Sequence, residues 1–331
     1  MLLAGLASAL GGQTGDGGKP ARAVDYSRVR GPHSTVWKEC VGAGRANEEL
    51  RADWQEQLAL VQKEIGFRYI RMHGLLHDDM GVYKEGAHGN PTYNWQYIDK
   101  LDDYLQRVGL KPFVELAFMP HDLASADKTV FWWHGNVTPP KSYDKWGALI
   151  ANLVRHFRER YGDAEVKTWY FEVWNEPGIP PFWSADLAEY LKLYKSAADA
   201  VKSVSKEYRV GGPASAMPYQ CEEERLRFWV SDDVALDFIS THACGVKEGF
   251  FDETGSRGTV LDADRTVVRA RTDPGTSAAG SPAARHRMEF RIHADRLSTR
   301  PVSPGCVHTR HRPIRCLTGS SRTSLRRTAR A

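Results

Sequence analysis

Hydrophobic and polar positions follow two alternating periods between residues 34 and 268. Short runs rich in β-branched and aromatic residues, which are typical of buried strands, alternate with longer stretches that have the 3.6-residue period of an amphipathic helix. The predicted strands are Val36–Val41, Phe67–His73, Pro112–Ala117, Val166–Val173, Tyr208–Val210 and Leu236–His242. The predicted helices are Glu48–Ile65, Trp95–Val108, Tyr143–Tyr161, Ala185–Ser205 and Glu222–Val230.

Six predicted strands, with a predicted helix between each successive pair, favour parallel strands that are joined by crossover helices. A TIM barrel closes with eight such repeats and needs about 250 residues, so a chain of 331 residues is long enough for one. The predicted fold class is therefore α/β, a (β/α)8 TIM barrel that is incomplete at about six β/α units.

The C-terminal segment 269–331 differs from this pattern. It contains 14 Arg, no Lys and 3 acidic residues, a net charge of +11, whereas residues 1–268 carry −7. Its Pro, Gly, Ser and Thr residues show no sustained period, which predicts a disordered basic tail. A nucleic-acid-binding arm is the functional alternative. A composition with many Arg and no Lys is typical neither of a disordered basic tail nor of a nucleic-acid-binding arm. It is the composition expected when a GC-rich gene is translated out of frame.

The N-terminal extension, residues 1–33, starts with an apolar stretch that lacks a basic segment. It is compatible with a signal-peptide remnant or with a frayed terminus, so cytoplasmic and secreted locations both stay open. No run approaches the roughly 20 apolar residues of a membrane span. The 5 cysteines are scattered, which predicts neither a disulfide framework nor a zinc site.

The segment 169–177 places a carboxyl group at the end of a predicted strand. Val173 and Trp174 favour a strand, which Pro177 stops because proline has no N–H to donate. Glu176 is therefore expected at the carboxyl edge of the sheet, where α/β barrels carry their chemistry. Among indole rings a carboxyl group is desolvated, so we expect a raised pKa that suits a general acid. The structural alternative is a glutamate that only hydrogen-bonds a neighbouring loop.

Aromatic residues make up 11% of the chain, with 10 Trp. Indole and phenol faces that line a cleft are a usual way of holding sugar rings, although a Trp-rich core is the alternative. Several segments, in this order, resemble glycoside hydrolase family 39, the β-xylosidase and α-L-iduronidase group. They are Glu39–Arg45, Arg71–Gly74, Phe118–Pro120, Gly135–Pro140, Trp174–Pro177 and Ser240–His242.

The resemblance covers residues 34–268 and implies a carbohydrate substrate. It implies a TIM barrel that hydrolyses the O-glycosidic bonds of xylosides or xylo-oligosaccharides, as in xylan degradation, with retention and with two glutamates. It implies no cofactor, metal, nucleic acid or membrane, and leaves the oligomeric state open. An α-L-iduronidase-like glycosidase and a catalytically dead sugar-binding remnant are the alternatives.

By resemblance, Glu176 is the general acid/base, which cycles from acid to base. Asn175 is expected to hydrogen-bond the sugar 2-hydroxyl, and His73 to bind sugar hydroxyls. Glu172 faces the same way as Glu176 but deeper, and is expected to be a structural partner.

Four more residues are implied by the same resemblance. Arg71 is expected to be a buried cation that keeps the nucleophile ionised. His242 is expected to lie near the nucleophile. Phe118 and Trp183 are expected to form walls of the sugar site.

The nucleophile itself is not identifiable in this chain. The family carries it in a segment like Phe-Thr-Glu-Trp-Ser, which is absent, and no strand-like run ends in a substitute glutamate such as Glu248, Glu253 or Glu289. When the reading frame is shifted by one base, however, the codon of His286 can encode Thr and that of Arg287 can encode Glu, while that of Met288 must encode Trp. The hypothesis is that a frameshift near residues 265–270 replaced the last two β/α units, so that this chain is inactive.

Overall fold

The computed structural model describes residues 27–28, 31–32, 35–216, 228 and 234–242 in full, and the backbone of 246–248, 260–261 and 289–293. Within this part of the chain, a seven-stranded parallel sheet has the order β1-β2-β5-β8-β9-β10-β13, which is chain order. The strands are β1 (Cys40–Arg45), β2 (Tyr69–His73), β5 (Lys111–Leu116), β8 (Tyr170–Val173), β9 (Arg209–Ser215), β10 (Phe238–His242) and β13 (Glu289–His293). This is the wall of a barrel, so the predicted fold class, an incomplete TIM barrel, is confirmed.

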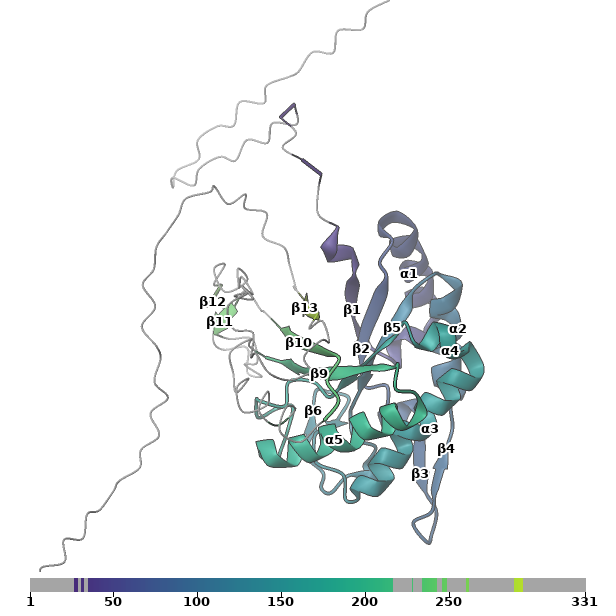
Figure 1. Ribbon diagram of the computed structural model, residues 1–331, viewed down its shortest axis with the longest axis vertical. Coiled ribbons are helices and arrows are strands. Elements are labelled where there is room, and N and C mark those ends of the chain that lie inside the picture. The colour runs from purple at the N-terminus through teal and green to yellow at the C-terminus, as the bar shows by residue number, and fades with distance from the viewer. Residues whose placement is uncertain are drawn as a thin grey trace, which may run out of the picture. The chain divides into compact units, whose positions relative to one another are not determined.

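The α-helices of the described residues lie on one side of this sheet (Figure 1). They are α1 (Ala52–Ile65), α2 (Gln96–Arg107), α3 (Tyr143–Tyr161), α4 (Asp163–Val166) and α5 (Leu187–Val204). The two longest helices, α3 and α5, each begin at a residue whose side chain caps the first turn. Ser142 accepts a hydrogen bond from the Lys145 N–H of α3, and Asp186 accepts one from the Glu189 N–H of α5. Gly66, with φ 74°, ends α1 in the left-handed conformation that glycine adopts without strain.

Shorter elements lie in the connections between strands and helices. The 3₁₀ helices are η1 (Val36–Lys38), η2 (Glu48–Leu50), η3 (Asp78–Met80) and η4 (His121–Leu123). Three antiparallel pairs are β3 (Tyr83–Glu85) with β4 (Pro91–Tyr93), β6 (Thr129–Val130) with β7 (Gly135–Asn136), and β11 (Val246–Glu248) with β12 (Val260–Leu261). The β6–β7 hairpin follows β5, and its connecting loop contains three aromatic residues, Phe131, Trp132 and Trp133.

Several predicted elements differ from the observed ones. Val36 to Lys38 form a 3₁₀ turn instead of the start of a strand, and β1 begins at Cys40. Val166 ends the short helix α4, so the strand predicted from this residue starts only at Tyr170. The strand predicted at 208–210 extends to Ser215. The helix predicted at 222–230 falls on residues of which only Phe228 is described, whereas the backbone strand β13 lies in a segment without a predicted strand.

The main hydrophobic core lies between the sheet and the helices. Its largest fully buried side chains include three tryptophans, Trp146 of α3, Trp169 just before β8, and Trp174 just after it. The indole N–H of Trp146 donates to the Leu193 carbonyl of α5 at 3.3 Å, so the core also joins the two longest helices. This core fixes β8 and therefore the residues that follow it.

A second, separate cluster of apolar side chains fills the inner face of the sheet. It contains Tyr69, Phe113, Tyr170 and Phe238, one from each of four wall strands. Their rings contact one another with centroid distances of 5.1–5.5 Å. We call these four rings the aromatic floor.

Side chains alternate along a strand, so the residues two positions after the floor lie on the same face and nearer the carboxyl edge. These residues are Arg71, Glu115, Glu172 and Ser240, all of which are buried. We call them the polar layer. The alternation therefore places a charged cluster directly above an apolar one, inside the barrel.

Candidate active site

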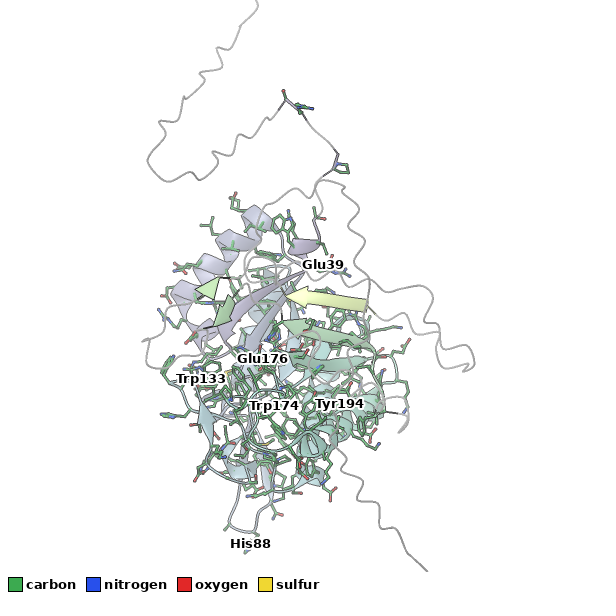
Figure 2. The ribbon with its side chains drawn as sticks, turned by 90° about the vertical axis from the view of Figure 1, so that its left-hand side faces the viewer. Glu39, His88, Trp133, Trp174, Glu176 and Tyr194 are labelled. Atoms are coloured by element: carbon green, nitrogen blue, oxygen red, sulfur yellow. The ribbon has the colours of Figure 1, made fainter. Side chains whose placement is uncertain are left out.

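Glu176 lies just beyond the carboxyl end of β8, with only 5% of its surface exposed. The chain bends sharply there, because Trp174 and Glu176 have φ angles of 72° and 47°, a region that side chains other than glycine rarely occupy. The Glu176 N–H donates to the Ala214 carbonyl at 3.1 Å, and this bond ties the bend to the end of β9. Figure 2 shows Glu176 and Trp174 in the interior, far from His88 at the tip of the β3–β4 hairpin.

His242, the last residue of β10, contacts the Glu176 carboxyl group. Its Nδ1 lies 2.6 Å from Glu176 Oε1. The resemblance placed His242 near the nucleophile, which is not identifiable in this chain; the partner that the structure gives His242 is Glu176, three residues after β8. Two strand ends that are 66 positions apart in sequence therefore meet at one carboxyl group.

Asn175 is also buried, and its amide orientation is fixed from below. Its Oδ1 accepts a hydrogen bond from Arg71 Nη2 at 2.9 Å. Because the amide oxygen is engaged with Arg71, the NH₂ group is the part of Asn175 that is left to donate to a ligand.

Arg71 lies in the polar layer, where it is a buried cation. Its Nε lies 2.6 Å from Glu172 Oε2, and its Nη2 lies 2.7 Å from Glu115 Oε2. Burial alone would lower the pKa of Arg71, but the attraction of Glu172 and Glu115 outweighs it and raises this pKa. The guanidinium therefore stays charged and neutralises part of the charge of two buried carboxylates.

His73, the last residue of β2, lies 2.7 Å from Glu115 through its Nδ1. Burial alone would raise the pKa of Glu115, but His73 and Arg71 outweigh it and hold this pKa below its ordinary value. Glu115 is thus an ionised acceptor for two donors. The His73 side chain is 25% exposed, so its ring also reaches the open side of the site.

The expected sugar walls, Phe118 and Trp183, lie below the accessible surface, with exposed fractions of 0% and 3%. Among the described residues, the exposed phenylalanine and tryptophan side chains belong to the β6–β7 hairpin. Phe131 is 39% exposed and Trp132 is 76% exposed, and the Phe131 ring centroid lies 5.8 Å from that of His73. These two rings, which the sequence reasoning did not single out, are the ones available to stack on a ligand beside His73.

Arg45, the last residue of β1, holds this hairpin. Its guanidinium lies 5.0 Å from the Trp132 ring and 5.3 Å from the Trp133 ring, within the range of cation–π attraction. It also forms a 2.7 Å ion pair with Asp79 of η3. Loops that follow β1, β2 and β5 are therefore joined through one side chain at the carboxyl edge.

Glu115 is a further residue that the sequence reasoning missed. A signal was present, because a glutamate in the middle of the apolar run Pro112–Leu116 must find a partner inside the barrel.

Among the described residues, no His, Cys, Asp and Glu side chains group in a way that could hold a metal ion. No helix in the same part of the chain combines the length and apolar character that a membrane span requires.

A buried glutamate, its histidine partner and a fixed asparagine at the carboxyl edge of parallel barrel strands are typical of TIM-barrel glycoside hydrolases. The chain belongs to glycosyl hydrolases family 39, whose sequence profile matches residues 22–260. That match ends before the Arg-rich segment begins.

Individual relatives agree with this assignment. A β-xylosidase of Caldicellulosiruptor saccharolyticus is 48% identical over 220 residues, which cover 66% of this chain and 45% of that protein. Human α-L-iduronidase is 27% identical over 247 residues, 68% of this chain and 36% of that protein. The crystal structure of a monomeric β-xylosidase from Caulobacter crescentus CB15 superposes with a TM-score of 0.65 at 42% identity, covering 72% of this chain and 48% of that one. The chain spans less than half of the length of each of these relatives.

Proposed function

We propose that this chain carries the acid/base half of the active site of a retaining glycosidase that acts on β-xylosides. The contact between Glu176 and His242 at the carboxyl edge carries the proposal, because it joins a buried carboxyl group to a second polar side chain where barrels bind substrates. The identity of 48–50% with two β-xylosidases, against 27% with human α-L-iduronidase, favours a β-xyloside.

In this mechanism Glu176 first protonates the glycosidic oxygen and later accepts a proton from the attacking water. His242 holds the carboxyl group through Oε1, which leaves Oε2 for the proton transfer. The NH₂ group of Asn175 donates to the sugar 2-hydroxyl, a bond that strengthens as the ring approaches an oxocarbenium ion. His73 binds a neighbouring hydroxyl.

Retention requires a second carboxyl group about 5 Å from the first, which attacks the anomeric carbon. Glu115 and Glu172 are poor candidates, because both are bound to Arg71 in the polar layer. Within residues 269–331 no segment resembles the one that carries the family's nucleophile. We propose that this segment is an out-of-frame product and that the chain, by itself, binds sugar without turnover.

The test compares three proteins on an aryl β-xyloside: the chain, a version in which the frame is corrected after about residue 268, and the corrected version with Glu176→Gln. The corrected protein should hydrolyse the substrate, and Glu176→Gln should lower its rate by about 10²–10⁴-fold. The chain itself should show saturable xylose binding without hydrolysis. Faster hydrolysis of an aryl α-L-iduronide would move the assignment to the iduronidase branch, and hydrolysis by the uncorrected chain would refute the missing nucleophile.

A further inference from the structure

Glu115 is the carboxylate of the polar layer that contacts both His73 and Arg71, and Arg71 in turn contacts Asn175. It lies in the interior of β5 and is 1% exposed. Its Oε2 is 2.7 Å from His73 Nδ1 and 2.7 Å from Arg71 Nη2. Its other oxygen, Oε1, has no hydrogen-bond partner among the described residues.

The first contact determines which nitrogen of His73 carries hydrogen. An ionised carboxylate can only accept, so Nδ1 must be the donor in this pair. The second ring nitrogen, Nε2, is then the one that a ligand meets. Without Glu115, neither the tautomer nor the ring orientation would be set from within the barrel.

The second contact reaches Asn175 through Arg71. The same nitrogen, Nη2, binds both Glu115 Oε2 and Asn175 Oδ1. Glu115 therefore fixes the end of the guanidinium group that orients the Asn175 amide. One carboxylate thus controls two ligand-facing groups, one at the end of β2 and one just after β8.

Glu172 provides the natural comparison. It is Glu115's register partner on the neighbouring strand, it is equally buried, and it binds the same arginine through Nε. No contact links it to His73 among the interactions of the described residues. The two side chains therefore differ in their relation to His73 and agree in burial, strand position and contact with Arg71.

We propose that Glu115 is a positioning residue, which sets the His73 tautomer and, through Arg71, the Asn175 amide. The statement that these positioned atoms bind a sugar rests on the proposed function. The tautomer of His73 is independent of that function. Glu115 does not itself contact the substrate, and its effect is transmitted by His73 and Asn175, which do.

The direct test is ¹⁵N NMR of the histidine rings in the full chain, with the His73 signals assigned by their loss in His73→Gln. In the unchanged chain, the neutral ring of His73 should be protonated at Nδ1. Finding it protonated at Nε2 would overturn the proposal without any variant of Glu115. Glu115→Leu should abolish the Nδ1–H signature, Glu115→Gln should retain it through the amide oxygen, and Glu172→Leu should leave it in place.

Thermal unfolding separates this effect from a general loss of structure. Both leucine variants remove one buried partner of Arg71, so both should lower the midpoint. Equal changes of the His73 signals in Glu115→Leu and Glu172→Leu would show a structural role only and refute positioning.

Xylose titration is the second readout. Glu115→Leu should weaken xylose binding by about tenfold or more, since it leaves donors misaligned or unpaired in the site, and Glu115→Gln should restore most of the affinity. If the unchanged chain binds no xylose, the proposed function fails, while the His73 tautomer still decides the role of Glu115.

Discussion

Removal of the Arg71 cation should destabilise the fold far more than removal of a surface arginine with equally short contacts. Arg71→Met keeps an apolar stem but leaves two carboxylates, Glu115 and Glu172, buried without their shared cation. Their exposed fractions are 1% and 0%, and each already has one oxygen without a partner among the described residues. Breaking a buried ion pair from one side costs about 3–5 kcal/mol, so we expect a loss of that size in the free energy of unfolding.

Arg160 is the matched control. Its Nη2 lies 2.6 Å from Asp103 Oδ2, as short as the contact between Arg71 and Glu172, but the two side chains are 38% and 43% exposed. Solvent screens such a pair, so Arg160→Met should cost about 0–1 kcal/mol. Urea unfolding followed by circular dichroism at pH 7 measures both variants.

The pH dependence of the loss is a further check. The folded-state pKa of Glu115 is lowered, so its contribution to stability is present above the unfolded pKa of about 4.3 and is lost as pH falls through the folded value. The deficit of Arg71→Met should therefore be largest at neutral pH and shrink in acid, where Glu115 becomes protonated. Equal losses for Arg71→Met and Arg160→Met, or a deficit that grows in acid, would refute this reasoning.

Three other substitutions test a buried charge in helix α2 and the packing and ligand contacts of the β6–β7 hairpin. Burial, together with the charges of Asp99 and Asp103, raises the pKa of Asp102, so the ionised form destabilises the fold above the unfolded pKa. Asp102→Asn should therefore raise the free energy of unfolding at pH 7 by about 1–3 kcal/mol. This gain, measured by urea unfolding, should vanish as pH falls below about 4. Gly135→Ala would place its Cβ 2.7 Å from the Trp133 ring and 2.9 Å from the Phe118 ring, so thermal unfolding should show a loss of about 1–3 kcal/mol, and an unchanged midpoint would contradict the close packing of the hairpin. Trp132→Ala removes a ring that is 76% exposed together with its cation–π contact to Arg45, so it should lower the free energy of unfolding by at most about 1 kcal/mol. It should weaken xylo-oligosaccharide binding in calorimetry by about 0.5–1.5 kcal/mol.

The sequence periods predicted the α/β fold class and much of the element order. Helix α3 has the predicted bounds, Tyr143–Tyr161, because Ser142 caps its start and Gly162 follows its end. The carboxyl-edge position of Glu176 was predicted for the same kind of reason, since strand propensity and Pro177 are local signals.

The partners inside the barrel were not predicted, because they depend on register. A period of two shows that Arg71, Glu115 and Glu172 can face inward, but which pairs meet depends on how β2, β5 and β8 are staggered. Arg71 and Glu172 are 101 positions apart in sequence. The contact of His242 with Glu176 and the burial of Phe118 and Trp183 are also set by tertiary packing rather than by any local pattern.

The aromatic floor has a consequence for the route by which solvent reaches the polar layer. Within the part of the chain that the structure describes, four contacting rings lie directly below Arg71, Glu115 and Glu172. The rings separate these groups from solvent on that side, so we expect water and protons to exchange with them from the carboxyl edge, past Asn175 and His73. A ligand bound there would act as a lid, so the guanidinium hydrogens of Arg71 would exchange with solvent more slowly whenever the site is occupied.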